Sequence, residues 1–391
     1  MRPADAAIAG AGIGGLCTAL ALARKGWRVS LYEKAQFLEE AGAGLQLSPN
    51  ASAILQKLGV AGRLSAFALH PKAITVRRAR DGAILTALPL GEAEQRWRAP
   101  YLAVHRADLQ RALLEAAAAE PAIRLMTGAE ITGFERDGET VLAAFVQGAV
   151  VSKVTASCLI GADGVRSFVR QRLGFGSAKP SGLVAWRALV DAARVPSAMR
   201  QNEIALWLGR GAHLVHYPLR DGTAINVVAV VHDDWRGSAD DFWSSPGEGF
   251  LLQAHFQGWD EAPKKLLRAA AGWRKWPLFD CPPLANWVCG RIALVGDAAH
   301  PILPFLAQGA AQAIEDADAL GAALDQNQDI KGGLAAYQQA RQARALRVQK
   351  ESRRQAAIYH LPGPAALVRD CILRAIDGQR MLARYDWLYG A

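Results

Sequence analysis

The chain has 391 residues, of which 51% are hydrophobic and 21% are charged. This is the profile of a globular protein with room for two packed domains. The net charge is +9, but it does not indicate a nucleic-acid-binding protein, because no interleaved aromatic residues or nucleic-acid-binding motif accompany the basic residues.

Part of the basic excess lies near the C-terminus. Six basic residues are spaced along residues 341–354: Arg341, Arg344, Arg347, Lys350, Arg353 and Arg354. Such a run is typical of a charged helix face in contact with solvent. The positive field predicts attraction of anionic substrates or cofactors.

The chain has five cysteines and no C-x-x-C pair. Their odd number and mostly apolar surroundings predict reduced thiols, no disulfide framework and no metal site. We therefore expect a cytoplasmic protein. The uncharged stretch over 6–23 is interrupted by glycines and runs into an amphipathic strand, so we do not expect a membrane span.

The first predicted unit is a strand over 6–9, the turn GAGIGG at 10–15, a helix over 16–25 and a strand over 28–32. The first glycine permits the turn, the second lets a pyrophosphate approach, and the last lets the helix lie close to the strand. The helix start offers free N–H groups to phosphates. Glu33 is placed to accept hydrogen bonds from ribose hydroxyls. This unit predicts a site for a cofactor that contains ADP.

Three pairs of extended runs come next, and each pair turns at Asp-Gly: 81–82, 137–138 and 221–222. This spacing predicts three β-hairpins. Helices are predicted over 51–58 and from His105 to about residue 119. A further apolar strand, over 156–160, leads to Asp163-Gly164 and another helix, so it extends the first sheet.

From about residue 180 the pattern changes to that of an antiparallel sheet, with LVAWRALV at 183–190 and HLVHYPLR at 213–220. Because alternate residues of a strand share a face, we expect His213 and Tyr217 on one face and His216 on the other. The tryptophan-rich stretch over 235–276 is predicted to form loops and helices.

The chain then returns to a nucleotide-binding pattern, with a strand over 291–295, Gly296-Asp297, and a helix over 310–324. The sequence thus predicts an α/β fold: a Rossmann-like domain interleaved with an antiparallel-sheet domain, followed by C-terminal helices. The predicted boundaries are 1–72, 101–180 and 277–335 for the first domain, 73–100 and 181–276 for the second, and 336–391 for the helices.

These motifs resemble the FAD-dependent aromatic hydroxylases, which are single-component flavoprotein monooxygenases. The resemblance covers residues 5–350 and includes Glu33, GAGIGG at 10–15, GAGLQLSPN at 42–50, HRADL at 105–109, GADGVRS at 161–167 and GRIALVGDAAHP at 290–301. HLVHYPLR, together with PFLAQGAAQAIEDA at 304–317, is most similar to the salicylate, 3-hydroxybenzoate and 6-hydroxynicotinate hydroxylase branch. One departure is Pro304, where some members of this branch carry a polar residue.

The resemblance implies which residues hold FAD. Glu33 would bind the adenosine ribose, Arg106 would reach the pyrophosphate or ribityl chain, and Ile131 would meet adenine through its backbone. Asp163 belongs to a segment that serves both FAD and NAD(P)H, and Asp297 would bind the ribityl chain. The complete set of candidate cofactor-binding residues is Gly10, Gly12, Gly14, Gly15, Glu33, Lys34, Arg106, Ile131, Asp163, Asp297, Gly309 and Ala310.

The implied activity is hydroxylation of a small aromatic or heteroaromatic phenolic acid. NADH or NADPH reduces FAD, O2 adds to give a C4a-hydroperoxide, and the substrate ring attacks the distal oxygen. Ionising the ring hydroxyl needs a base, and His213 and Tyr217 are the catalytic candidates. The alternative is that both are ordinary sheet residues. Arg187 and Arg220 are candidates for binding a substrate carboxylate or, alternatively, salt-bridged surface groups.

Two other classes stay open. A flavin oxidase or dehydrogenase of another small substrate shares the glycine turn, but would not be expected to carry both the Asp163-Gly164 and the Gly296-Asp297 segments. A non-catalytic FAD-binding module would bind flavin without NAD(P)H consumption stimulated by an aromatic compound. The sequence also leaves open the substrate, the choice between NADH and NADPH, and the oligomeric state, including a homodimer.

Overall fold

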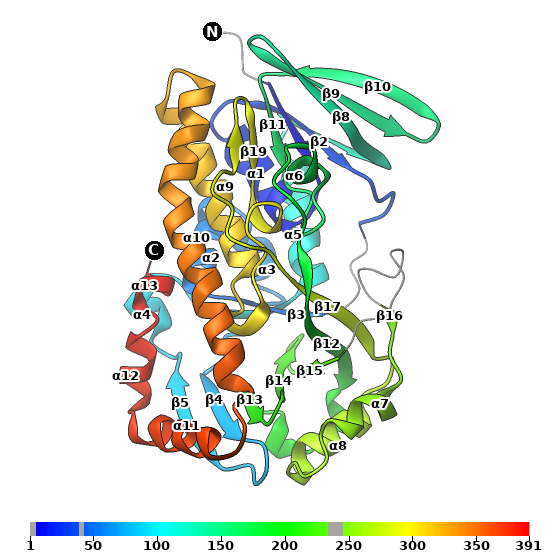
Figure 1. Cartoon of the computed structure of the whole chain (residues 1–391). Coiled ribbons are helices and arrows are strands. Elements are labelled where there is room, and N and C mark those ends of the chain that lie inside the picture. Colours follow the sequence, from blue (N-terminus) through cyan, green and yellow to red (C-terminus); the bar gives the residue numbers. More distant parts are fainter. Residues whose placement is uncertain (1–4, 39–42, 234–244, 391) are drawn as a thin grey trace.

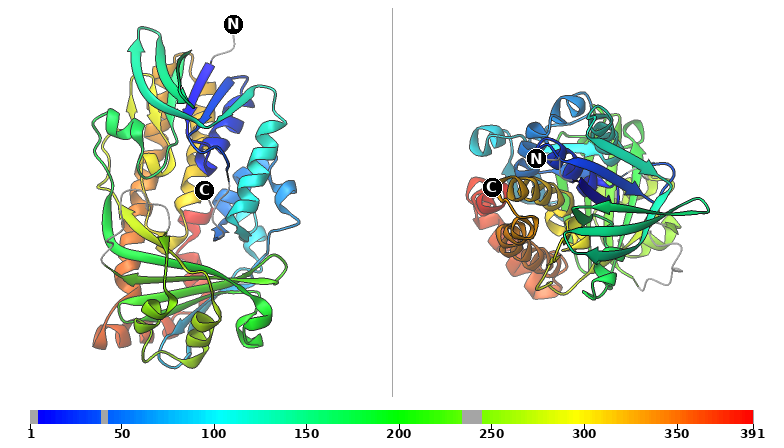
Figure 2. Two further views of the ribbon diagram at one scale, coloured as in Figure 1. Left: turned by 90° about the vertical axis from the view of Figure 1, so that its right-hand side faces the viewer. Right: turned by 90° about the horizontal axis from the view of Figure 1, so that it is seen from above.

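The computed structural model describes residues 5–38, 43–233 and 245–390. Gly42, which begins the GAGLQLSPN segment, and the predicted loops over 235–244 lie outside the described residues. A six-stranded sheet lies in the upper part of the molecule and an eight-stranded sheet in the lower part (Figure 1). The long helix α10 (Ile330–Tyr359) runs alongside both parts, as Figure 2 also shows.

The six-stranded sheet has the order β18–β19–β11–β1–β2–β7. Its pairs are parallel except for β18 with β19. The strands are β1 (Asp5–Ala9), β2 (Arg28–Glu33), β7 (Ile123–Thr127), β11 (Cys158–Gly161), β18 (Val288–Cys289) and β19 (Ile292–Leu294). The central strand β1 is apolar because it is covered on both faces. The prediction of a Rossmann-like sheet is confirmed.

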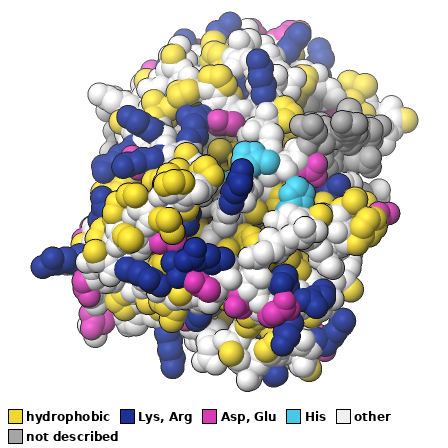
Figure 3. All heavy atoms as spheres, turned by 60° about the horizontal axis from the view of Figure 1, so that its bottom comes forward, with side chains coloured by type: hydrophobic (Ala, Val, Ile, Leu, Met, Phe, Trp, Pro, Cys, Tyr) yellow, Lys and Arg dark blue, Asp and Glu magenta, His cyan; other side chains and the backbone are white. Residues whose placement is uncertain are grey.

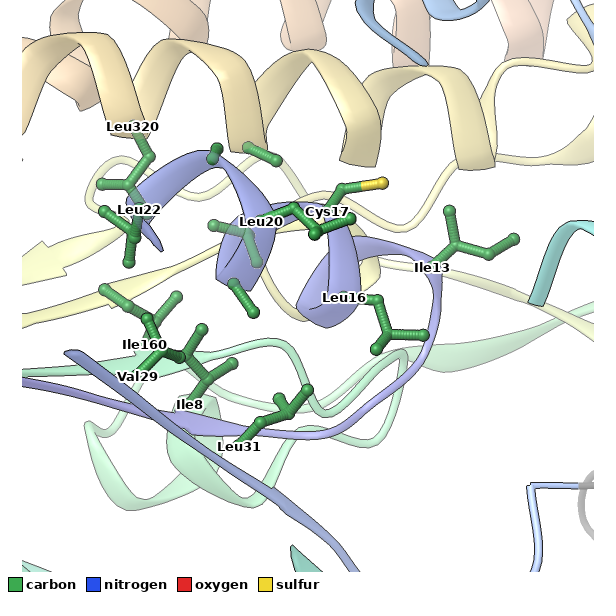
Figure 4. Packing of buried hydrophobic residues seen from close by; sticks show 14 of the residues in the cluster. Ile8, Ile13, Leu16, Cys17, Leu20, Leu22, Val29, Leu31, Ile160 and Leu320 are labelled. Atoms are coloured by element: carbon green, nitrogen blue, oxygen red, sulfur yellow. The ribbon is translucent and has the colours of Figure 1, made fainter. Parts of the chain in front are cut away.

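Helix α1 (Ile13–Ala23) lies between this sheet and α9 (Gly309–Gln326). Figure 4 shows Ile8 and Val29 of the strands below α1 and Leu320 of α9 above it. A helix without charges is stable in water only when it is covered on all sides, and here both neighbours cover it. Small residues allow the close approach: a Cβ at Gly321 would lie 3.2 Å from the Cβ of Ala21.

Two smaller sheets flank the first. The strands β8 (Ala129–Asp137), β9 (Thr140–Gln147) and β10 (Val150–Ala156) form an antiparallel sheet. It contains the hairpin predicted at Asp137-Gly138. The strands β3 (Gly44–Leu47) and β6 (Leu102–His105) form a two-stranded antiparallel ribbon, after which α5 (Arg106–Ala118) begins.

The eight-stranded sheet has the order β16–β17–β12–β15–β14–β13–β4–β5 and joins two distant parts of the chain. Its strands are β4 (Ala73–Arg78), β5 (Ile84–Pro89), β12 (Lys179–Asp191), β13 (Ile204–Gly209), β14 (Ala212–Leu219), β15 (Ala224–His232), β16 (Ser245–Pro246) and β17 (Arg274–Asp280). The two hairpins predicted in this part of the chain are present. The prediction of loops and helices over 235–276 was wrong at β16 and at the start of β17, because both strands pair into this sheet.

Each face of this sheet packs against helices. On one face, α7 (Gly249–Ala254) and α8 (Glu261–Ala269) cover a core that includes Trp186 and Leu266. On the other, the C-terminal helices contribute Met381 and Leu388 to a core with Leu206. The remaining helices are α2 (Pro49–Lys57), α3 (Ala61–Leu64), α4 (Ala93–Trp97), α6 (Phe168–Arg172), α11 (Gly363–Ala375), α12 (Gly378–Ala383) and α13 (Asp386–Tyr389). Within the described ranges, no helix combines the length and the apolar character that a membrane crossing requires.

Candidate active site

Three turns that are far apart in the sequence follow neighbouring strands at one edge of the six-stranded sheet. Ala9 pairs with Gly161, and Gly161 pairs with Leu294. The strands β1, β11 and β19 therefore end side by side. This carboxyl edge is where α/β sheets bind their ligands. The structure thus brings together the three segments that the sequence singled out separately.

Glycine is required where the first turn meets the second. Gly10 has φ +98°, and a Cβ there would lie 2.5 Å from the carbonyl oxygen of Ala162. A Cβ at Gly15 would lie 1.9 Å from the oxygen of Gly10. A Cβ at Gly12, by contrast, would meet no atom of the described residues within 4 Å. The backbone at Gly12 is therefore open to an approaching phosphate.

Helix α9 contacts both the first and the third turn through one small residue. The Cβ of Ala313 lies 3.3 Å from the position of a Cβ at Gly14 and 2.9 Å from that at Gly296. Larger side chains at any of these positions would push α9 away from the sheet edge. Gly14 therefore serves helix packing, and α9 is held next to the glycine turn.

Two helix starts at this edge have no side-chain cap among the described residues. Helix α1 follows Gly12 and α9 follows Gln308, and neither has an acidic residue in its first turn. The first N–H groups and the helix dipole favour a negatively charged group at each start. The start of α1 fits a pyrophosphate, and the start of α9, with Gly309 and Ala310, fits the anionic edge of a reduced flavin.

Glu33 ends β2, and its carboxylate lies beside the glycine turn. The N–H of Ala11 donates to Oε2 at 2.8 Å, and the N–H of Ala35 donates to Oε1 at 2.9 Å. Each oxygen keeps acceptor capacity for a ribose hydroxyl. Lys34 is exposed, and Ile131 is buried near the start of β8.

Asp163 and Asp297 extend the site beyond the glycine turn. Oδ2 of Asp163 accepts from the N–H of Val169 at 3.0 Å, whereas its buried Oδ1 has no hydrogen-bond partner in the described part of the chain. Burial raises the pKa of Asp163. The side chain of Asp297 retains accessible surface. Desolvation by the surrounding protein nevertheless raises its pKa, and the nearby His300 and Arg106 partly offset this rise. A hydroxyl-rich cofactor such as FAD would satisfy the orphaned acceptor.

Arg170 was missed by the sequence interpretation. It is fully buried on α6 and donates to the carbonyl oxygens of Asp297 and Ala298, both at 3.2 Å. It also donates to the carbonyl oxygen of Val165. Arg170 therefore ties the second turn to the third. Only its position in the helix after Asp163-Gly164 could have indicated this.

A buried ionic network supports the start of α9. Nε2 of His300 lies 2.6 Å from Oδ2 of Asp316, and Nε of Arg341 donates to Oδ1 of Asp316 at 2.8 Å. Burial opposes ionisation, but His300 and Arg341 lower the pKa of Asp316 to about 2. Arg341 and Arg344 also bind Glu315. The expectation that these two arginines lie on a solvated helix face was wrong, because their acidic partners are on α9.

The loop before α9 also lines a cavity of about 720 Å³. The other walls come mainly from β4, β5, β13 and β14 of the eight-stranded sheet and from α10, α11 and α12. Most lining side chains are apolar, and the polar exceptions on the sheet side are Gln46, Thr86, Tyr101 and His213. Such a cavity suits a ring-shaped ligand held by a few polar groups.

His213 lines this cavity and Tyr217 does not belong to its described lining. Nδ1 of His213 lies 2.9 Å from Nε2 of His360, and burial lowers the pKa of His213 well below its ordinary value. Tyr217 is 2% exposed, and burial raises its pKa. The expected alternation is present, because His216 lies on the other face and accepts from Nε1 of Trp207 at 3.3 Å.

The two arginines proposed for a substrate carboxylate lie elsewhere. The guanidinium of Arg187 is 5.3 Å from the ring centroid of Trp276, and Nε of Arg220 is 3.5 Å from Oδ2 of Asp108. Neither is among the described residues that line the cavity. Its arginines come from the C-terminal helices and the end of α10: Arg354, Arg369 and Arg384. Arg354 belongs to the basic run noted in the sequence, whereas no sequence signal indicated Arg369 or Arg384, because their helices carry no motif.

The comparisons with known proteins agree with this geometry. Residues 3–352 match the family described as FAD binding domain. The chain is 36% identical over 393 residues to a 3-hydroxybenzoate 6-hydroxylase of Polaromonas naphthalenivorans (strain CJ2), covering 100% of this chain and 97% of the relative.

Solved structures give the same result. Klebsiella pneumoniae HpxO complexed with FAD and uric acid has a TM-score of 0.83 and 27% identity, covering 97% of this chain and 95% of that one. A salicylate hydroxylase substrate complex has a TM-score of 0.84 and 27% identity, covering 100% and 96%.

Proposed function

The chain belongs to the FAD binding domain family, with a hydroxylase among its full-length relatives, and from this premise we propose that it is an FAD-dependent monooxygenase. It hydroxylates a small phenolic acid, aromatic or heteroaromatic, with electrons from NADH or NADPH and an oxygen atom from O2. One observation carries this proposal. The turns at 10–15, 162–164 and 296–297 meet at one sheet edge, and the loop over 304–307 connects that edge to a cavity lined by His213.

The residues of this edge would hold successive parts of FAD, from the adenosine ribose to the ring. Glu33 takes the adenosine ribose, the open backbone at Gly12 and the start of α1 take the pyrophosphate, and Asp297 takes the ribityl hydroxyls. The start of α9 faces the ring. When bound, FAD supplies the electron transfer and the activation of oxygen, which side chains cannot provide.

The chain's own residues act on the substrate. A phenol is more reactive toward an electrophilic oxygen when its hydroxyl proton has been removed. His213 is placed to accept this proton, because its Nδ1 faces His360 and its Nε2 remains for the ligand. Burial lowers its pKa, so the ring is neutral and able to accept near pH 7. Tyr217, whose pKa is raised by burial, stays protonated and lies on the same face of β14 as His213.

The lining of the cavity determines which class of substrate it favours. The apolar lining excludes water from a bound ring and favours an aromatic ligand. Arg354 and Arg384 contribute positive charge to the lining near the C-terminal helices. This charge favours an acid over a neutral phenol.

The test is a screen of the purified protein. We expect a bound-flavin absorption spectrum, and NAD(P)H oxidation that speeds up with a small phenolic acid and yields its hydroxylated product. Hydrogen peroxide without a hydroxylated product would instead indicate an oxidase. Bound flavin without stimulation by any aromatic acid would indicate a non-catalytic module.

The same preparation answers three finer questions. Comparing NADH with NADPH identifies the electron donor, and light scattering decides between a monomer and the homodimer that the sequence left open. The five cysteines are all free in the structure, which supports a reducing compartment such as the cytoplasm.

A further inference from the structure

Three histidines lead from the cavity to the protein surface. His213 lines the cavity, and its Nδ1 is 2.9 Å from Nε2 of His360. The ring centroid of His360 lies 5.4 Å from that of His232, which is exposed. Figure 3 shows that histidine side chains reach the surface between basic and apolar ones on the face that includes the lower end of the molecule.

The sheet explains why two of these residues share a face. His213 of β14 is opposite Val230 of β15, and His232 comes two residues after Val230. Alternate residues of a strand point the same way, so His232 lies on the same face as His213. His360 follows the end of α10, and its carbonyl oxygen accepts from the N–H of Gly211, just before β14.

Aromatic rings enclose the inner end of this chain of histidines. Phe305 and Tyr359 have ring centroids 5.1 and 5.4 Å from that of His213. The Tyr359 hydroxyl donates to the carbonyl oxygen of Phe305 at 3.3 Å, so it is engaged elsewhere. Among the described residues, His360 is therefore the polar side chain bonded to His213.

The titratable groups around His360 come from four elements. They are His213 of β14, His232 of β15, its chain neighbour Tyr359 of α10 and Arg369 of α11. Arg369 is paired with Asp370 at 2.8 Å and also donates to carbonyl oxygens at the end of α10. The carboxylate of Asp370 is thus already neutralised by an arginine.

We propose that His360 is a positioning residue that passes the substrate's phenolic proton from His213 to solvent beside His232. This rests on the proposed function. The substrate O–H bond breaks and an N–H bond forms at Nε2 of His213. At the same time the Nδ1–H bond of His213 breaks, its proton binds to Nε2 of His360, and the proton on Nδ1 of His360 leaves to solvent. No electrons are transferred, and the reverse sequence restores both rings when the product is protonated.

The ionisation state of both rings suits this relay. Burial lowers the pKa of His213, and His360 lowers it further. Burial, His232 and Arg369 lower the pKa of His360 to about 4. Both rings are neutral at pH 7, and a neutral imidazole accepts on one nitrogen while it donates from the other. The rings of His360 and His232 lie edge-on with centroids 5.4 Å apart, and His232 is exposed, so the outer end of the relay adjoins solvent.

The experiment follows the proton directly. The holoenzyme is mixed with 3-hydroxybenzoate in weak buffer in a stopped-flow instrument, and a pH indicator reports the release of the phenolic proton. We expect His360→Gln to slow this release by about tenfold or more, because glutamine keeps a hydrogen bond but cannot exchange tautomers. The final amount of released proton should stay the same. Added imidazole should restore the rate in His360→Ala.

The control is His216→Gln, which changes a buried histidine on the other face of the same strand and should leave the rate unchanged. His232→Asn, at the exposed end, should slow release less than His360→Gln. Wild-type rates in both His360 variants would overturn the relay alone. If the wild-type enzyme releases no proton and no aromatic acid stimulates NAD(P)H oxidation, the proposed function fails, and the relay fails with it.

Discussion

His213 and Tyr217 lie on one face of β14 and are both buried, but of the two His213 alone is among the described residues that line the cavity. Sequence alternation predicted the shared face correctly, because it depends only on the pleat of a strand. It could not predict which of the two side chains reaches the cavity. The ribbon strand β3 covers Tyr217, and a Cβ at Gly44 would lie 2.6 Å from its hydroxyl. That contact joins residues far apart in the sequence, so no local pattern indicates it.

Tyr217→Phe tests whether this covered hydroxyl matters. We expect aromatic-stimulated NAD(P)H oxidation to fall about fivefold in kcat/KM, the effect of losing about one hydrogen bond that positions neighbouring groups. FAD should remain bound, because Tyr217 lies outside the sheet edge that holds it. Steady-state kinetics and the flavin spectrum of the same preparation measure both effects. An unchanged kcat/KM would remove Tyr217 from the mechanism.

Glu33→Ala tests the ribose site. The variant loses a charged acceptor for two hydroxyls and the bonds that Glu33 accepts from Ala11 and Ala35. We expect the Kd for FAD to rise about 10- to 100-fold. Fluorescence titration of the apoprotein with FAD measures it. Glu130→Ala, which removes an exposed acid near the start of β8, is the matched control, and equal affinities in the two variants would contradict the ribose role.

At the scale of elements, the sequence predicted the helices and hairpins well but did not predict which helices pack against one another. The turn residues Asp81-Gly82 and Asp221-Gly222 fix their hairpins locally. The basic run on α10 is not determined locally in this way, because the same spacing of basic residues fits a helix face exposed to solvent or one buried against acidic partners. Arg341 and Arg344 form ion pairs with the acidic residues 315 and 316 of α9. Arg347 and Lys350, by contrast, are exposed.

The network between α9 and α10 also reaches the C-terminus. Arg344 binds Glu315 and donates to the carbonyl oxygens of Trp387 and Leu388 at 2.6 and 2.7 Å. Asn50 of α2 donates to Glu315 at 2.5 Å. Glu315 thus joins α2, α9, α10 and α13 near the helix start that would face the flavin.

We expect Glu315→Gln to destabilise the protein by roughly 3–5 kcal/mol, because it leaves buried arginine charge without its partner. Asp325→Asn is the control on the same helix. It breaks the half-exposed pair between Asp325 and Lys25, and such pairs contribute about 1 kcal/mol or less. Urea unfolding followed by circular dichroism measures both. Similar losses in the two variants would show that the network does not hold α9 in place.

At the scale of the whole molecule, the sequence predicted two kinds of sheet in one interleaved chain. It could do so because strand periodicity and the glycine motifs are local signals. The cavity is not local: α10, α11 and α12 close it against a sheet built from residues 73–89 and 179–280. Which apolar helix faces meet is decided by packing. The C-terminal segment was therefore predicted as helical but without a role.

Buried histidines make the stability of the whole chain depend on pH. Burial lowers the pKa of His213 and His360, and it lowers that of His216 to about 3. The unfolded chain therefore binds protons first as the pH falls below about 6.5, and the free energy of unfolding falls with it. Asp163 and Asp297 act in the opposite sense, because their pKa values are raised in the folded state, which therefore binds protons before the unfolded chain does at these two positions.

The contribution of His216 can be isolated by comparing the wild type with His216→Gln. Between pH 6.5 and 4 the unfolded wild-type chain binds a proton at this position that the folded chain excludes. Its free energy of unfolding should therefore fall faster than that of the variant, by up to about 1.4 kcal/mol per pH unit. Urea unfolding at pH 7, 6, 5 and 4.5 measures the two slopes. Parallel slopes would mean that His216 can be protonated in the folded protein, and that the face of the sheet covered by α7 and α8 admits a charge.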